Sequence, residues 1–233
     1  MGKTLTQQKR GKGSSTYRSN GFNSVGKTTQ IEQKFTRVKD ILNCVGHKAP
    51  ILQLEYENNQ RSFSVAAEGI KVGDTLKCGE GAELKIGNSL YLADIPEGVT
   101  IFNIEITPGD GGKLVRTSGT FAKVVSKTKN KIIIKLPSGK QKELNPKCLA
   151  SIGVVAGSGR TEKPFLKAGN KKKTMAARGK YWPIVSGAAM NAVDHPLGGS
   201  RSSRKGRPTI APRNAPPGRK VGMIRPRQTG RNR

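Results

Sequence analysis

The sequence predicts a mainly β protein in which two small barrels are flanked by extended basic arms. Three observations support this fold class. The middle of the 233-residue chain holds short runs of apolar and β-branched residues, separated by glycine-rich turns. This middle part is nearly balanced in charge, whereas both ends are strongly basic. The last 77 residues are also rich in glycine and proline, a composition that disfavours an independent core.

The first barrel is predicted from short strands that begin near residue 40. Residues 51–56 alternate apolar and polar side chains over most of their length, as a half-buried strand does. Residues 58–61 are predicted to turn the chain into the next strand. Glycines lie between the later strands. The strands expected in this barrel are 40–45, 51–56, 62–66, 75–78 and 89–92.

A second group of strands predicts another small barrel. Residues 108–112 interrupt the group near its start, and residues 137–140 are typical of a tight turn. Local helical turns are expected within 28–38 and 164–177. Prolines near the C-terminus disfavour a long helix there, because proline lacks the N–H donor and restricts the preceding residue. The strands expected in the second barrel are 100–106, 114–115, 121–125, 131–136 and 148–155.

Charge is the strongest indication of the partner. The formal net charge is +28, and residues 157–233 hold nineteen Lys or Arg but only two acids, Glu162 and Asp194. Phosphate neutralisation with counterion release explains this run better than a solvated surface does. An acidic membrane is the rival partner, but Gly and Pro interrupt the amphipathic helix that it requires. Tyr181 and Trp182 lie among the charges, where they would stack on bases or anchor the arm to the barrel.

The candidate RNA-binding residues lie in the C-terminal region. A lone histidine such as His195 is more often a hydrogen-bonded structural residue, yet it would equally donate to, or stack on, a nucleotide. Gly198 and Gly199 would let the backbone approach a partner closely, since glycine has no side chain. The predicted residues are Lys171, Lys172, Lys173, Arg178, Lys180, Trp182, Asn191, His195, Arg201, Arg204, Lys205, Arg207, Arg213, Arg219, Lys220, Arg225 and Arg227.

Two other motifs suggest an enzyme or a metal site, and neither has the context that it needs. Residues 21–28 match the phosphate loop G-x-x-x-x-G-K-[ST], but no buried strand precedes them and strands do not alternate with helices. We interpret them as flexible basic sequence. Cys44 and His47 are only half of a zinc site, so no metal, cofactor or catalytic residue is predicted. Three scattered cysteines and the lack of a long apolar run favour a soluble, intracellular protein.

Several motifs together resemble the family of the universal large-subunit ribosomal protein L-two. The most specific are GRTEKP at 159–164 and MNAVDHPLGG at 190–199, which are most similar to the archaeal form of the archaeal and eukaryotic cytosolic branch. Leu197 and Ser200 stand where many relatives have other residues. The resemblance covers most of the chain and also includes residues 87–90, 95–98, 103–105, 108–109, 136–139 and 213–222.

The resemblance implies both a fold and a function. The domains expected from it are a basic N-terminal extension at 1–37, an oligonucleotide-binding-type barrel at 38–108, an SH3-like barrel with the following basic segment at 109–180, and an extended basic arm at 181–233. A structural constituent of the large ribosomal subunit is implied, located on cytoplasmic ribosomes and binding ribosomal RNA and neighbouring ribosomal proteins. It would meet the small subunit at the interface, and support subunit association and the peptidyl transferase region.

The resemblance also implies a role for His195. Peptide-bond formation in the ribosome is attributed to RNA, so His195 is expected to position RNA and not to transfer a proton. No enzymatic activity is therefore predicted. The alternatives are a nucleic-acid-binding protein outside the ribosome and a phosphate-loop nucleotide hydrolase.

Overall fold

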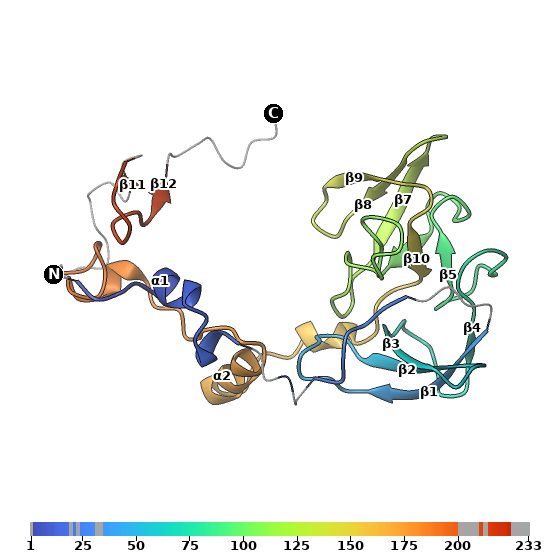
Figure 1. Cartoon of the computed structure of the whole chain (residues 1–233), viewed down its shortest axis with the longest axis horizontal. Helices are drawn as coiled ribbons and strands as arrows, with labels where there is room; N and C mark the ends of the chain where they lie inside the picture. The colour runs from blue at the N-terminus through green and yellow to red at the C-terminus, as the bar shows by residue number, and fades with distance from the viewer. Residues whose placement is uncertain are drawn as a thin grey trace. The chain divides into compact units, whose positions relative to one another are not determined.

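The computed structural model describes residues 2–18, 21, 24–30, 35–199, 210–211 and 214–224. The chain divides into two compact units. One unit, Asn20–Leu166, contains the two main sheets, and the other combines Met1–Ser19 with Lys167–Arg233. The sheets are antiparallel and curled, which confirms the predicted mainly β class with barrel-like domains (Figure 1).

The first sheet has the strand order β3-β2-β1-β4. Its strands are β1 (Thr36–Leu42), β2 (Ile51–Tyr56), β3 (Arg61–Val65) and β4 (Thr75–Leu76). β1 begins earlier than expected because Thr36 and Val38 are buried and pair with both β2 and the segment leading into β4. The helical turn expected within 28–38 is therefore wrong at its C-terminal end, and residues 31–34 lie outside the described residues.

The second sheet has the strand order β5-β10-β6-β7-β8-β9. One of its strands, β9, was not expected from the sequence. The segment expected at 114–115 makes only a single bridge, from Leu114 to Ile104. The strands are β5 (Ser89–Tyr91), β6 (Thr100–Phe102), β7 (Ala122–Lys127), β8 (Ile132–Lys135), β9 (Gln141–Leu144) and β10 (Leu149–Ile152).

Strand β5 belongs to the second sheet, so its expected place in the first barrel is wrong. It pairs with β10, with Tyr91 opposite Leu149. Leu90 is buried in the same cluster as Ile101 and Ile134, which explains the pairing, because its apolar partners come from β6 and β8. The domain boundaries at 38–108 and 109–180 remain predictions.

The two sheets also share a group of buried side chains. Phe102 of β6 packs with Val65 of β3 and with Val155, and Ala67 bridges to Val155. These four residues are at most 3% exposed. The barrel unit is thus held together by apolar packing across both sheets.

The second unit consists of short elements. They are α1 (Thr6–Gly11), η1 (Ser15–Tyr17), α2 (Ala168–Ala177), η4 (Gly187–Ala189) and a parallel pair of β11 (Ile210–Ala211) with β12 (Met223–Ile224). A further turn, η3 (Ser158–Thr161), ends the barrel unit. The helical turn expected within 164–177 is confirmed by α2.

Candidate nucleic-acid interface

Helix α2 carries three of the predicted cations on consecutive positions. No residue of this helix is buried, and Lys171, Lys172 and Lys173 are all exposed. Since successive helical residues are about 100° apart, the three ammonium groups point in different directions around the helix. Lys171 places its Nζ atom 5.4 Å from the centre of the Trp182 ring, a cation–π contact. A polar helix with this charge is suited to a polyanion and not to a protein core.

The chain reverses direction immediately after α2. Gly179 has φ +63° and donates its N–H to the carbonyl of Ala176, which ends the helix in the left-handed conformation. Lys180 then donates its N–H to Met175. Arg178 has a buried Nε atom without a hydrogen-bond partner among the described residues, while Lys180 is exposed. This reversal brings Trp182 back beside the cations of α2.

The loop around His195 is folded tightly on itself. The carbonyl of Asn191 accepts hydrogen bonds from the N–H groups of Asp194 and His195, at 3.0 and 3.2 Å. Gly198 donates its N–H to the carbonyl of His195 at 2.8 Å. The N–H of Leu197 donates to Nδ1 of His195 at 3.1 Å. These bonds fix both the backbone of the loop and the orientation of the imidazole ring.

The glycines of this loop serve contacts within the chain. A Cβ atom on Gly187 would collide with the ring of His195, and one on Gly198 would collide with the carbonyl of Asn191. Gly199 has φ +83°, and a Cβ there would lie 2.7 Å from the Cβ of Ala192. In this structure Gly198 and Gly199 allow close packing within the loop itself, and their expected approach to a partner stays a prediction.

The N-terminal segment lies beside this loop, which the sequence did not predict. The backbone N–H of Lys3 donates to the carbonyl of Val193 at 2.8 Å, and Nζ of Lys3 pairs with Asp194 at 3.1 Å. In Figure 1 the blue N-terminal segment runs beside the orange C-terminal segment. Helix α1 adds Lys9 and Arg10, both exposed, to the same region. The strong positive charge of residues 1–40 was the only sequence signal for their involvement.

Two cavities flank the His195 loop. Residues of the N-terminal segment and of the loop line both, and their volumes are about 340 and 670 Å³. His195 and Asp194 contribute to each of them. The Asp194 carboxylate is already neutralised by Lys3.

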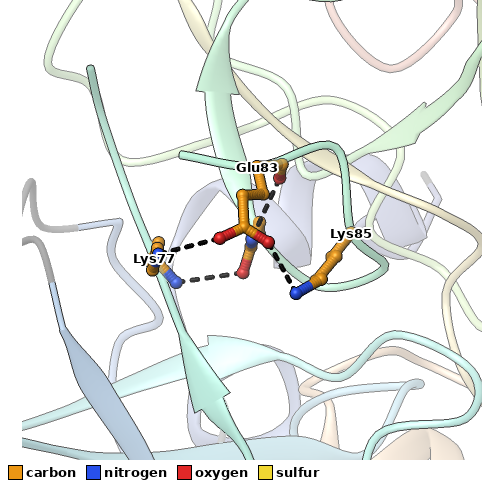
Figure 2. Close-up of polar contacts among 4 residues, drawn as sticks. Lys77, Glu83 and Lys85 are labelled. Carbon is orange, nitrogen blue, oxygen red and sulfur yellow. Dashed lines mark hydrogen bonds and ion pairs between the residues drawn. The ribbon is translucent and has the colours of Figure 1, made fainter. Parts of the chain in front are cut away.

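Carboxylates in the barrel unit neutralise a different set of lysines. Figure 2 shows Glu83 between Lys77 and Lys85, and hydrogen bonds from Lys85 and then Lys77 lower the pKa of this carboxyl to about 2. The backbone of the same segment is held by the side chain of Asn88, which accepts from the N–H of Lys77 and donates to the carbonyl of Glu83. Because Glu83 already pairs with them, Lys77 and Lys85 should attract a phosphate less strongly than the lysines of α2 do.

Comparison with known proteins identifies the family. A profile described as Ribosomal Proteins L2, C-terminal domain, matches residues 85–219, more than half of the chain. The chain is 48% identical to the large ribosomal subunit protein uL2 of Methanothermobacter thermautotrophicus, over 100% of both chains. It belongs to the uL2 family. Its identity to uL2 of Methanocaldococcus jannaschii is 48% over 99% of each chain, and to uL2 of Haloarcula marismortui 48% over 99% of this chain and 98% of the relative.

Membership of the uL2 family confirms the predicted resemblance, including its archaeal character. The chain is a component of the large ribosomal subunit and a ribonucleoprotein constituent in translation, and RNA binding is general for the uL2 family. The family is structural rather than enzymatic. In the described part of the chain, no helix is both long enough and apolar enough to cross a membrane.

Among the described residues around it, the phosphate-loop match of this uL2 protein has no nucleotide-binding context. The segment before it contains the short helix η1, residues 24–30 have no regular structure, and Thr29 donates its N–H to Phe63. Lys27 is exposed and Thr28 is buried. A phosphate loop instead needs a strand before it and a helix after it. Phe22 and Asn23 lie outside the described residues.

The remaining predicted RNA-binding residues lie near the C-terminus. Arg219 and Lys220 are exposed on the segment between β11 and β12, where the N–H of Arg219 donates to Pro216. The predicted RNA-binding residues that lie outside the described ones are Arg201, Arg204, Lys205, Arg207, Arg213, Arg225 and Arg227.

Cys44 and His47 make a contact of 3.1 Å, and the described residues hold no cluster of three His, Cys, Asp or Glu side chains that would bind a metal.

Proposed function

We propose that this uL2 protein binds large-subunit ribosomal RNA mainly through its basic C-terminal residues. The exposed and uncompensated charge of α2 carries this proposal. Lys171, Lys172 and Lys173 form no ion pair with a described carboxylate, unlike Lys77 or Lys131 of the barrel unit. Unpaired cations displace counterions from phosphates, so they supply sequence-independent affinity.

The other predicted residues would extend this contact. Trp182 offers a ring whose position is held by Lys171, so it would stack on an unpaired base. Arg178 and Lys180 would neutralise phosphates beside it. The remaining predicted cations are Arg201, Arg204, Lys205, Arg207, Arg213, Arg219, Lys220, Arg225 and Arg227. Bound in this way, the protein would contact neighbouring ribosomal proteins and the small subunit, and would support subunit association and the peptidyl transferase region.

His195 acts in this proposal as a positioning residue. Its Nδ1 accepts a hydrogen bond from the N–H of Leu197, so the neutral ring carries its proton on Nε2. Gly187 leaves room for the ring, and Asn191 fixes the backbone that carries it. A ring held in one tautomer and one orientation is suited to donating a hydrogen bond to RNA. Proton transfer would instead require Nδ1 or Nε2 to change its protonation state during the reaction.

A salt titration with matched variants tests the proposal. The test variant carries Lys171→Gln, Lys172→Gln and Lys173→Gln. The control variant carries Lys39→Gln, Lys77→Gln and Lys131→Gln, which remove three lysines that are ion-paired with Glu55, Glu83 and Glu143. Both lose three positive charges, so only the environment of the charges differs.

The affinity for large-subunit ribosomal RNA is measured against salt concentration. Log affinity falls as log salt rises. The test variant should make this slope shallower by about two units, since each lost phosphate contact removes about 0.7 to 0.9 from its magnitude. The control variant should change the slope by clearly less. Equal slopes for the test variant and the unmodified protein would refute the role of α2.

A further inference from the structure

The larger of the two cavities beside the His195 loop has the size and lining of a nucleotide site. Its volume is about 670 Å³, within the range of small-molecule sites. Lys9 and Arg10 of α1 line it together with Tyr181, Ile184 and Asn191. The cavity thus exists only because the N-terminal segment lies beside the C-terminal segment within one compact unit.

Three of the lining residues, Tyr181, Ile184 and Val185, are apolar and exposed. Ile184 is 79% exposed, Val185 49% and Tyr181 39%. Neighbouring apolar side chains with this exposure indicate a surface that another group covers. The ring of Tyr181 contacts the ring of Tyr17 in a tilted arrangement, with the ring centres 6.2 Å apart, and Arg10 lies 5.9 Å from the centre of the Tyr17 ring. Such a supported ring is suited to stacking on a flat, unsaturated partner.

The charge at the rim selects an anionic partner. Lys9 and Arg10 are exposed and form no ion pair with a described carboxylate. The one carboxylate in the lining, Asp194, is paired with Lys3 at 3.1 Å. The rim is therefore net positive, while the amide of Asn191 offers both a donor and an acceptor for a base edge. A flat apolar face, a polar edge and an anionic group together describe a nucleotide.

We infer that this cavity receives one unstacked nucleotide of ribosomal RNA, with its base against Tyr181 and Ile184 and its phosphate near Lys9 and Arg10. The inference rests on the proposed RNA-binding function and adds a specific site to it. Single-stranded RNA is recognised chiefly by such extruded bases. The N-terminal segment then forms part of the RNA site and does more than neutralise charge.

Chemical probing of large subunits that contain the full-length protein tests the inference. In the variant Ile184→Trp the larger side chain fills the cavity. The variant Ser186→Trp adds the same bulk at an exposed position that does not line the cavity. The reactivity of the base edges is compared in subunits that carry the unmodified protein or either variant. We expect one nucleotide, or a short run, to become several-fold more reactive with Ile184→Trp and to stay protected with Ser186→Trp.

The outcomes separate the site from the general function. A normal footprint in which Ile184→Trp and Ser186→Trp give the same reactivity at every protected base overturns the site and leaves RNA binding intact. The lack of any footprint for the unmodified protein would instead contradict the proposed function, and the site with it.

A second measurement applies if Ile184→Trp does not enter subunits. A photoreactive azidophenylalanine replaces Tyr181, which it closely resembles in shape, and subunits are irradiated. We expect a crosslink to a single region of ribosomal RNA. A crosslink only to protein, or to a free mononucleotide, would overturn the assignment to ribosomal RNA.

Discussion

Glu105 binds three backbone N–H groups through one buried carboxylate. The residue is 1% exposed, and its two oxygens accept hydrogen bonds from the N–H groups of Gly109, Gly111 and Leu149 at 3.0 to 3.1 Å. Glu105→Gln replaces an acceptor oxygen with a donor, which leaves at least one of these buried N–H groups without a partner. We expect the free energy of unfolding to fall by about 2 kcal/mol in urea titrations.

Glu97 provides the matched control for this substitution. It accepts one hydrogen bond, from the N–H of Lys127, but is exposed, so water replaces the lost partner. Glu97→Gln should therefore change the stability by less than about 1 kcal/mol. Equal effects at the two positions would show that burial of Glu105 does not matter.

The lowered pKa of the Cys44 thiol should make the stability of the protein depend on pH. Burial raises the pKa of its thiol, but hydrogen bonds from the His47 ring and from the backbone N–H groups of Val25, His47 and Gly46 outweigh this effect and lower the pKa to about 6. A pKa that is lower in the folded state than in the unfolded chain stabilises the fold at high pH, and this contribution is lost as the pH falls toward 6. The ordinary pKa of such a thiol is 9.0.

The comparison with Cys44→Ser measures this contribution. In urea unfolding, the unmodified protein should gain stability relative to the variant as the pH rises from about 6 to about 9. Cys148→Ser is the control. Burial raises the pKa of the Cys148 thiol, so this thiol stays neutral over the range and its replacement should cause no such pH dependence. A stability difference between unmodified protein and Cys44→Ser that does not change with pH would contradict the assignment.

At the scale of elements, strands β7 and β8 place two like charges directly opposite each other. Lys123 pairs in register with Lys135, and both side chains are exposed. Like charges at opposed positions destabilise a sheet. Lys135→Glu should therefore raise the free energy of unfolding of the free protein by about 0.2–1 kcal/mol at low salt, and the gain should diminish as salt is added.

The neighbouring lysine gives an opposite expectation. Lys131 donates a hydrogen bond to the carboxylate of Glu143 at 2.7 Å, and this interaction raises the pKa of the lysine. Lys131→Glu replaces attraction by repulsion and should lower stability under the same conditions. If both substitutions changed stability in the same direction, local charge pairing would not be the cause.

The elements also show which parts of the fold the sequence could predict. Strand β2 has the predicted bounds, because residues 51–56 alternate and their apolar side chains are buried. Strand β9 was missed because QKEL contains a single apolar residue and pairs only with β8 at the edge of the sheet. The partner of β5 was also missed, since pairing with β10 depends on residues about 60 positions away.

The candidate site was predicted only in part, because contacts between residues far apart in the sequence cannot be read from composition. Composition identified the cations of α2 and the neighbouring Trp182, whose types suit RNA. It did not predict the contact of Lys171 with Trp182, which depends on the chain reversal at Gly179. Nor did it predict the contact of Lys3 with Asp194, because the two residues are almost the full chain length apart.

At the scale of the whole molecule, the two basic ends form one compact unit despite their like charge. Contacts such as the hydrogen bond from Lys3 to Val193 and the ion pair of Lys3 with Asp194 offset the repulsion. Deleting residues 2–12 removes both contacts and α1. We expect hydrogen exchange at the amides of Asp194, His195 and Gly198 to accelerate about tenfold or more in the free protein.

Two comparisons make this deletion informative. The amides of β7 and β8 lie in the barrel unit, and their exchange should not change. Lys3→Glu removes the ion pair but keeps the backbone hydrogen bond to Val193, so it should accelerate exchange in the loop less than the deletion does. Equal exchange in the deletion variant and in the unmodified protein would mean that the ends do not support each other before RNA binds. The His195 loop would then acquire its order from RNA alone.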